Sequence, residues 1–373
     1  MASGAGDTYL SAHMASLLSP RFFKRGLEFF ALASVIALVA LLIYGNSWRA
    51  SLEAVERLKL GWALAALGLA SSDWWGGGVR IWLLSKFLYR DTPFGGMILA
   101  GGLNTWGSYL TPSQTGGGPV MIWAMKRAGV PVPEATIATF MSFVGTVVFF
   151  AIAGPLAILL GAGRSLRAHG IPLVHLSLYD VFKASAWGFV VVGVLLLFVL
   201  VFPGRARWML HAAISLLERR GSGRIAGLVA GLREGIDRMQ ECVVKFLTPA
   251  GWLAMLGGVA TSSLAHANKL LAAYVVLRAL GIEANLVDVL LVQTTIAFLL
   301  YFAPTPGGAG AAEALSAALM GLYVPRALLP IYTVLWRFTV SYATVIFGSF
   351  VFFKLLHGTL EESKAAAEAV PAS

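Results

Sequence analysis

The chain has 373 residues, of which 58% are hydrophobic and only 12% are charged, and its formal net charge is +10. Soluble domains carry about 25% charged residues, so this composition excludes an ordinary soluble protein and indicates a polytopic membrane protein. The basic residues lie mainly in loops between apolar runs, where membrane topology accounts for them, so we expect no nucleic acid partner.

In chain order, apolar runs alternate with short charged loops. A small polar segment at residues 1–20 is expected to be a disordered tail, and residues 358–373 form a charged tail. Between them, several runs reach the length of about 20 residues that a helix needs to cross a bilayer. We predict membrane spans at residues 27–44, 60–84, 134–161, 182–202, 250–281 and 328–356.

Basic side chains dominate residues 204–247, where they alternate with Leu, Ile, Ala and Val at helical spacing. This pattern is typical of an amphipathic segment on the membrane surface. The positive-inside rule places the segment in the cytoplasm, together with both termini. It separates a first transmembrane half at 21–203 from a second half at 248–357.

Two further apolar segments are interrupted in the middle. The segment at 94–124 contains Thr-Pro-Ser-Gln-Thr-Gly-Gly-Gly-Pro at 111–119, and the segment at 286–324 contains Ala-Pro-Thr-Pro-Gly-Gly-Ala-Gly at 303–310. Each has room for two half-helices but is short for two full spans. Irregular backbone at membrane depth is tolerated only inside protein or beside a wet cavity. We therefore predict an all-α bundle with two broken or re-entrant hairpins that are related as inverted repeats.

The two breaks are the first candidate site. A half-helix that starts after each break would direct unpaired backbone N–H groups and the positive end of its dipole toward the membrane midplane, which favours an anion. Glycine allows a headgroup to approach the backbone closely. The predicted substrate-binding residues at the breaks are Pro112, Ser113, Gln114, Gly116, Gly117, Gly118, Pro306, Gly307, Gly308 and Gly310.

Ionisable side chains within the apolar runs are the second signal, because each costs at least about 2.5 kcal/mol at the bilayer centre. Lys269 shares a helical face with His266, and Asp73 shares one with Arg80. Ion pairs that only join helices are an alternative reading of equal weight. The candidates for substrate contact are Arg80, His266, Lys269, Glu313 and Arg337. A Glu313–Arg337 pair is compatible with the sequence, which does not show it.

Catalytic motifs are not evident in the sequence, which has no recognisable metal-ligand cluster, activated nucleophile or nucleotide-binding loop. We therefore expect a protein that is not an enzyme and that needs no cofactor and no metal.

The breaks also carry a resemblance to a known family. The run at 111–117, followed by Lys-Arg-Ala-Gly-Val-Pro at 126–131, resembles the first signature of the lysylphosphatidylglycerol synthase transmembrane-region family. The run at 304–310 with Glu313, then Trp336-Arg337, resembles its second signature. The resemblance covers about residues 27–356 and implies lipid translocation. It implies no lysyl transfer, because this sequence lacks the soluble aminoacyltransferase domain, and Gly118 stands where the family often has an acidic residue.

The resulting expectation is a lipid flippase in a bacterial plasma membrane, with a polar site between two inverted halves. Its partner would be an anionic phospholipid or an isoprenoid-phosphate lipid, and small-residue faces such as 251–258 would allow a homo-oligomer. One alternative is an ion-coupled secondary transporter of a small polar solute that uses the same broken helices. The other is a non-transporting membrane scaffold that docks a partner through residues 204–247.

Overall fold

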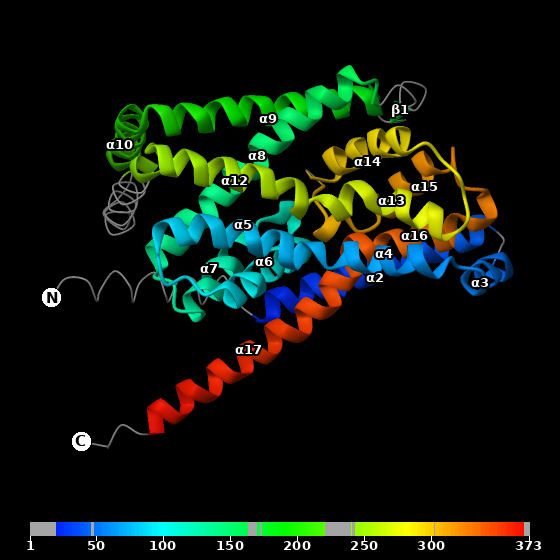
Figure 1. Cartoon of the computed structure of the whole chain (residues 1–373), viewed down its shortest axis with the longest axis horizontal. Helices are drawn as coiled ribbons and strands as arrows, with labels where there is room; N and C mark the ends of the chain where they lie inside the picture. Colours follow the sequence, from blue (N-terminus) through cyan, green and yellow to red (C-terminus); the bar gives the residue numbers. More distant parts are fainter. Residues whose placement is uncertain are drawn as a thin grey trace.

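The computed structural model describes residues 20–45, 48–162, 170–171, 174–220, 240, 243–301 and 303–368. These residues are almost entirely helical, as predicted (Figure 1). The described strands form one short antiparallel hairpin, in which β1 (Gly170–Ile171) pairs with β2 (Val174–Ser177). The tails at 1–19 and 369–373, and much of the predicted basic segment, lie outside the described residues.

Long apolar helices form the outside of the bundle. Among the described residues, 4 helices are long and apolar enough to cross a membrane: Pro20–Tyr44, Val132–Leu159, Phe182–Val201 and Arg326–Gly358. They confirm the predicted spans at 27–44, 134–161, 182–202 and 328–356. The corresponding elements are α2 (Pro20–Gly45), α8 (Val132–Leu159), α9 (Leu178–Val201), and the series η5 (Arg326–Leu328), α16 (Leu329–Arg337), the π-helical η6 (Phe338–Tyr342) and α17 (Ala343–Glu368).

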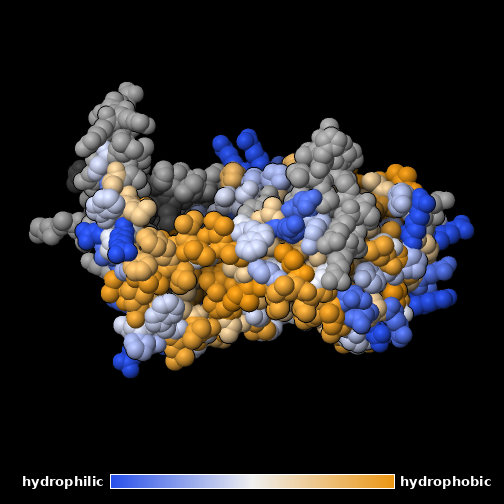
Figure 2. Space-filling model, turned by 90° about the horizontal axis from the view of Figure 1, so that it is seen from above, coloured by the Kyte–Doolittle hydropathy of each residue, from blue (hydrophilic) through white to orange (hydrophobic). Residues whose placement is uncertain are grey.

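The surface of the bundle matches a hydrocarbon environment. Many large hydrophobic side chains are exposed; Leu32, Ile43 and Leu195, for example, are each 60% or more exposed. Exposing so much apolar surface to water would be unfavourable. Figure 2 shows a broad hydrophobic area across the middle of one face, with hydrophilic side chains concentrated toward both ends of the long axis. This distribution is that of an integral membrane protein whose spans run along the long axis.

Two of the predicted spans are not continuous helices, and the structure corrects them. Residues 60–84 are divided at Ser71 into α4 (Leu60–Ala70) and α5 (Ser72–Leu88), and residues 250–281 are divided at His266 into α12 (Pro249–Ala265) and α13 (Ala267–Ala279). At each break a polar side chain bonds to the preceding turn: Ser71 Oγ to the Gly68 carbonyl at 2.6 Å, and His266 Nδ1 to the Ser262 carbonyl at 2.8 Å.

The divided helices pack against each other in opposite directions. α5, the second part of the first divided helix, contacts α12, the first part of the second one, and α4 contacts α13. The two divided helices are therefore antiparallel. Glycine allows the close crossing, since a Cβ at Gly76 would lie 3.0 Å from the Ala265 Cα. The two halves of the chain are thus joined along these antiparallel helices.

Each interrupted segment folds as a helical hairpin with half-helices, as the sequence indicated. The first consists of α6 (Phe94–Tyr109), η1 (Pro112–Gln114) and α7 (Gly117–Arg127), and the second of α14 (Leu286–Tyr301), η4 (Pro306–Gly308) and α15 (Ala311–Met320). At 1.5 Å per residue, α6 is about 24 Å long and α7 about 16 Å long, both shorter than the bilayer core of about 30 Å. Re-entry from one membrane face is consistent with these lengths and stays a prediction.

The remaining described helices lie at the ends of the bundle. α3 (Trp48–Glu56) follows α2, and α10 (Pro203–Arg220) begins the predicted basic segment, whose residues 221–239 and 241–242 lie outside the described part. The core beneath the first hairpin is aromatic. Trp106 stacks on Phe23 and on Phe352, with ring centroids 5.0 and 4.4 Å away, and Phe23 and Phe352 also contact each other at 5.4 Å. These rings tie α2 and α17 to the first hairpin.

Candidate functional site

The two predicted breaks begin with the same backbone conformation, over residues 111–114 and 305–308. Each begins with a Thr-Pro pair, at 111–112 and 305–306, whose threonine is extended, and continues as a single 3₁₀ turn. The next two residues have positive φ, at 50° and 59° for residues 113–114 and at 58° and 64° for residues 307–308. Glycine adopts this conformation freely, whereas Ser113 and Gln114 are strained in it. Strained backbone of this kind is typical of functional sites.

The breaks lie side by side, although they are far apart in the sequence. η1 contacts η4, and α6 also packs against η4. A Cβ at Gly307 would lie 3.0 Å from the Tyr109 carbonyl oxygen and 2.6 Å from a ring carbon of Phe30. Glycine at this position is therefore required for the hairpins to meet.

A cavity of about 610 Å³ opens beside the two breaks. Its wall comes from both halves of the chain, including α5, α6, α8, α13, α14 and the η1 and η4 turns. Apolar side chains such as Phe143 and Leu300 alternate with polar ones in this wall. The polar side chains that line it include Arg80, Asn104, Ser108, Gln114, Thr146, His266, Lys269, Gln293, Thr305 and Arg337.

The structure brings together most of the predicted binding residues. Those that line the cavity are Arg80, Ser113, Gln114, Gly118, His266, Lys269, Gly307, Gly308 and Arg337. The others lie behind the wall and shape it. Gly116 donates its N–H to Thr111 Oγ1 at 2.8 Å, and a Cβ at Gly117 would lie 2.7 Å from the Asn104 carbonyl oxygen. The predicted residues outside the wall are Pro112, Gly116, Gly117, Pro306, Gly310 and Glu313.

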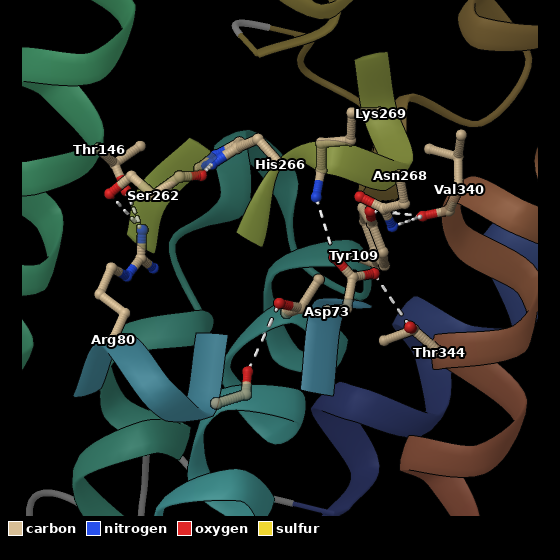
Figure 3. Close-up of polar contacts among 12 residues, drawn as sticks. Asp73, Arg80, Tyr109, Thr146, Ser262, His266, Asn268, Lys269, Val340 and Thr344 are labelled. Carbon is tan, nitrogen blue, oxygen red and sulfur yellow. Dashed lines mark hydrogen bonds and ion pairs between the residues drawn. The ribbon is translucent and has the colours of Figure 1, made fainter. Parts of the chain in front are cut away.

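Arg80 extends from α5 toward Thr146 and Ser262 (Figure 3) and lines the cavity. Its Nη1 donates to Thr146 Oγ1 at 2.7 Å and to Ser262 Oγ at 3.3 Å. Both hydroxyls donate their own protons to carbonyls of the preceding turn, so they present lone pairs to the guanidinium. Nε of Arg80 is buried without a partner, and no described carboxylate lies within ion-pair distance of the side chain.

Lys269 pairs with Asp73, across the junction of the two divided helices (Figure 3). Its Nζ lies 3.0 Å from Asp73 Oδ1, and Thr344 Oγ1 donates to Asp73 Oδ2 at 3.0 Å. The Asp73 side chain is fully buried, whereas that of Lys269 is 25% exposed. The sequence placed Asp73 and Arg80 on one helical face, but the two side chains do not pair. Asp73 points toward α13 and α17 instead.

The structure contains the Glu313–Arg337 pair that the sequence allowed but could not show, with Nε–Oε1 2.9 Å, and both side chains are buried. Glu313 Oε1 also accepts a hydrogen bond from the Tyr342 hydroxyl at 3.0 Å, and Oε2 caps α15 by accepting the Gly310 N–H at 2.8 Å. Arg337 donates to the Gly307 carbonyl through Nη1 and Nη2 at 3.3 and 3.4 Å. Glu313 thus fixes Arg337 at the second break and does not itself face the cavity.

His266 lies at the junction of α12 and α13 and has an apolar surrounding. Its ring stacks on Phe149 and meets Phe150 edge-on, at 5.4 and 5.0 Å between centroids. Because the Ser262 carbonyl can only accept, Nδ1 is the protonated donor in this bond. His266 therefore stabilises the helix junction and contributes one edge of the cavity wall.

Sequence reasoning did not identify every residue of the site. Thr146 was missed, and only its polarity within an apolar run signals it. Gln293, which Thr294 and Thr295 follow, stands out by its polarity, but the sequence favours a helix–helix contact for it. The Tyr109 hydroxyl donates at 2.7 Å to the carbonyl of Val340 in the π-helix η6. A π-helical turn leaves a carbonyl available to such partners, and it has no recognisable sequence pattern.

Comparison with known proteins agrees with the resemblance of the two signatures. A family model described as the lysylphosphatidylglycerol synthase TM region matches residues 29–348. A UPF0104 membrane protein of Archaeoglobus fulgidus is 22% identical over 322 residues, which cover 84% of this chain and 92% of that protein. No solved structure matches the chain.

Proposed function

The chain belongs to the lysylphosphatidylglycerol synthase TM-region family, and from this premise we propose that it is a lipid transporter that moves a phosphate-bearing headgroup across the membrane. The observation that carries the proposal is the polar, cation-lined cavity inside an otherwise apolar bundle. Polar groups at membrane depth are costly and mark substrate pathways.

The internal arrangement supports transport by two inverted halves. The divided helices α4–α5 and α12–α13 pack antiparallel, and each is followed by a hairpin whose break has the same Thr-Pro geometry. Inverted repeats with discontinuous helices surround a central substrate site in many secondary transporters. We infer that the hairpins are re-entrant and that the halves move against each other around the cavity.

The cavity is sized for one headgroup. Small-molecule sites measure about 300–1,000 Å³, and the 610 Å³ here fall in the middle of that range. Acyl or isoprenoid tails would remain in the bilayer while the headgroup crosses. The distribution of basic residues favours cytoplasmic termini in a plasma membrane.

Reconstitution into liposomes tests this function. Fluorescent phosphatidylglycerol in both leaflets is exposed to a membrane-impermeant reductant, and loss of fluorescence beyond the outer-leaflet fraction reports flipping. We expect the wild type to flip the lipid and Gly118→Leu to block it, because Gly118 lines the cavity and a Cβ there would meet only Thr139 at 3.7 Å.

Gly61→Leu is the matched control, since Gly61 is likewise the second residue of an 11-residue helix and its Cβ would meet nothing within 4 Å. Flipping that survives in Gly118→Leu, or is absent from wild-type liposomes, would contradict the proposal. Uptake of a soluble anion without lipid flipping would favour the small-solute transporter.

A further inference from the structure

We propose, on the premise that the cavity receives a lipid headgroup, that this headgroup is anionic and carries no amine, with Arg80 as the anchor of its phosphate. The chain would then discriminate against a lysyl-bearing lipid, although its family is described by the lysyl-lipid synthase. The inference follows from which charges of the cavity are neutralised and which are not.

Two of the cations that line the cavity are already neutralised. Lys269 pairs with Asp73 at 3.0 Å and Arg337 with Glu313 at 2.9 Å, and both carboxylates are sealed from solvent. Neither acid lines the cavity. Lys269 and Arg337 therefore contribute hydrogen-bond donors to the site but little net charge.

Arg80 is different, because hydroxyl groups are its only hydrogen-bond partners in the part of the chain that the structure describes. Its side chain is 7% exposed, Nη1 bonds to Thr146 and Ser262, and Nε is buried with no partner. A buried charge with no counter-ion is unfavourable, so the site is completed by an anion supplied from outside the chain. A phosphate oxygen matches the planar donors of a guanidinium especially well.

A second unpartnered donor belongs to Gln293, a residue that lines the same cavity, and this donor atom is buried in the wall. Gln293 is 1% exposed, and its Oε1 accepts from Trp336 Nε1 at 2.9 Å. Since the indole can only donate, this bond fixes the orientation of the amide and leaves Nε2 free. Nε2 has no partner in the described part of the chain. Both unpartnered nitrogens therefore require an acceptor, not another donor.

The wall offers nothing that would hold an ammonium group by charge. Of the residues described, none that lines the cavity is acidic, whereas Arg80, Lys269 and Arg337 all line it. A lysyl headgroup would bring two ammonium groups into this field at about pH 7. Its phosphate would still suit Arg80, but the added amines would meet cations, neutral polar groups and aromatic rings, and no described carboxylate of the wall would pair with them.

Binding of short-chain lipids to the purified protein in a non-ionic detergent tests the inference separately from transport. The probes are dihexanoyl phosphatidylglycerol, its lysyl ester, and glycerol 3-phosphate as a headgroup without tails. The variants are Arg80→Gln, Arg80→Lys, and Lys86→Gln as an exposed control on the same helix.

We expect phosphatidylglycerol to bind at least about tenfold more tightly than its lysyl ester. Arg80→Gln should weaken phosphatidylglycerol binding about tenfold or more, the usual effect of losing a charge-assisted hydrogen bond. Arg80→Lys should retain the preference and Lys86→Gln should leave it unchanged. Equal or tighter binding of the lysyl ester, unaltered binding in folded Arg80→Gln, or no binding of any probe would overturn the inference.

If Arg80→Gln does not fold, two measurements still test the inference: the ratio of the affinities of the wild type for phosphatidylglycerol and its lysyl ester, and the same ratio in Arg80→Lys. Glycerol 3-phosphate that binds as tightly as phosphatidylglycerol would support the charge assignment while placing the substrate among soluble anions. Anionic preference without lipid flipping in liposomes would likewise retain the inference and reject the proposed transport function.

Discussion

The guanidinium of Arg337 and the carboxylate of Glu313 form a buried ion pair next to the second break, with Nε–Oε1 2.9 Å. The same carboxylate caps α15 and accepts the Tyr342 hydroxyl, so one side chain joins the break, α15, α16 and the π-helix η6. This arrangement assigns Glu313 a structural role, and Arg337 is the member of the pair that lines the cavity.

Removing one partner of this ion pair should strongly destabilise the protein. Arg337→Met leaves the Glu313 carboxylate buried without its counter-ion, and loss of one member of a buried pair costs about 3–5 kcal/mol. We expect a large fall in the thermal unfolding temperature in detergent. The double variant Glu313→Gln/Arg337→Met should recover part of the loss, because it removes the unpaired charge. Equal instability of the single and double variants would mean that the pair is not the cause.

Alanine substitutions of two glycines at the second break should destabilise the protein to different extents. Gly307 and Gly310 have φ of 58° and 83°, so alanine is strained at both, by about 1–2 kcal/mol. At Gly307 the new Cβ would also clash with Phe30 and approach the Tyr109 carbonyl, whereas at Gly310 it meets nothing within 4 Å. Gly307→Ala should therefore destabilise the protein more than Gly310→Ala.

The order can be checked by the unfolding temperatures of the two purified variants. A Phe30→Ala change should narrow the difference, since it removes the ring that a Cβ at Gly307 would touch. Equal loss of stability in both variants would show that backbone strain alone determines the effect.

Some elements of the fold could be predicted from the sequence and others could not. Long apolar runs and Pro-Gly clusters mark the spans and both hairpin breaks, because lipid requires continuous helix and these residues interrupt it. The divisions at Ser71 and His266 were not predictable, because neither position holds proline or glycine and each depends on a side chain bonded to the preceding turn.

For the site residues, the sequence identified candidates, but their contacts depend on how the helices pack. Glu313 and Arg337 were both candidates because they are ionisable residues in apolar runs, but only the structure, in which Arg337 reaches the second break, shows that they pair. The partner of Lys269 is Asp73, which lies in the other half of the chain, and only the antiparallel packing of α5 and α12 and of α4 and α13 brings the two together. Periodicity along one helix placed Asp73 near Arg80 and could not reveal that contact.

The Tyr109 hydroxyl connects the end of α6 to the π-helix through the Val340 carbonyl. Tyr109→Phe removes this 2.7 Å bond without changing the ring, and leaves the carbonyl with a 3.5 Å bond from Asn268. We expect a loss of about 1 kcal/mol, measured as a lower unfolding temperature. Tyr274→Phe, at a half-buried tyrosine of α13, is the control and should have little effect.

The central claim is that a lipid headgroup enters the cavity between the two breaks. The most direct measurement uses phosphatidylglycerol with a photoreactive group on its headgroup glycerol, incorporated into liposomes with the protein, and maps the adducts by mass spectrometry after illumination. We predict adducts on cavity residues such as Met121, Ile122 and Phe143, and their loss in Gly118→Leu. Adducts confined to outward-facing side chains such as Leu195 and Ile346, and unchanged in Gly118→Leu, would contradict the account.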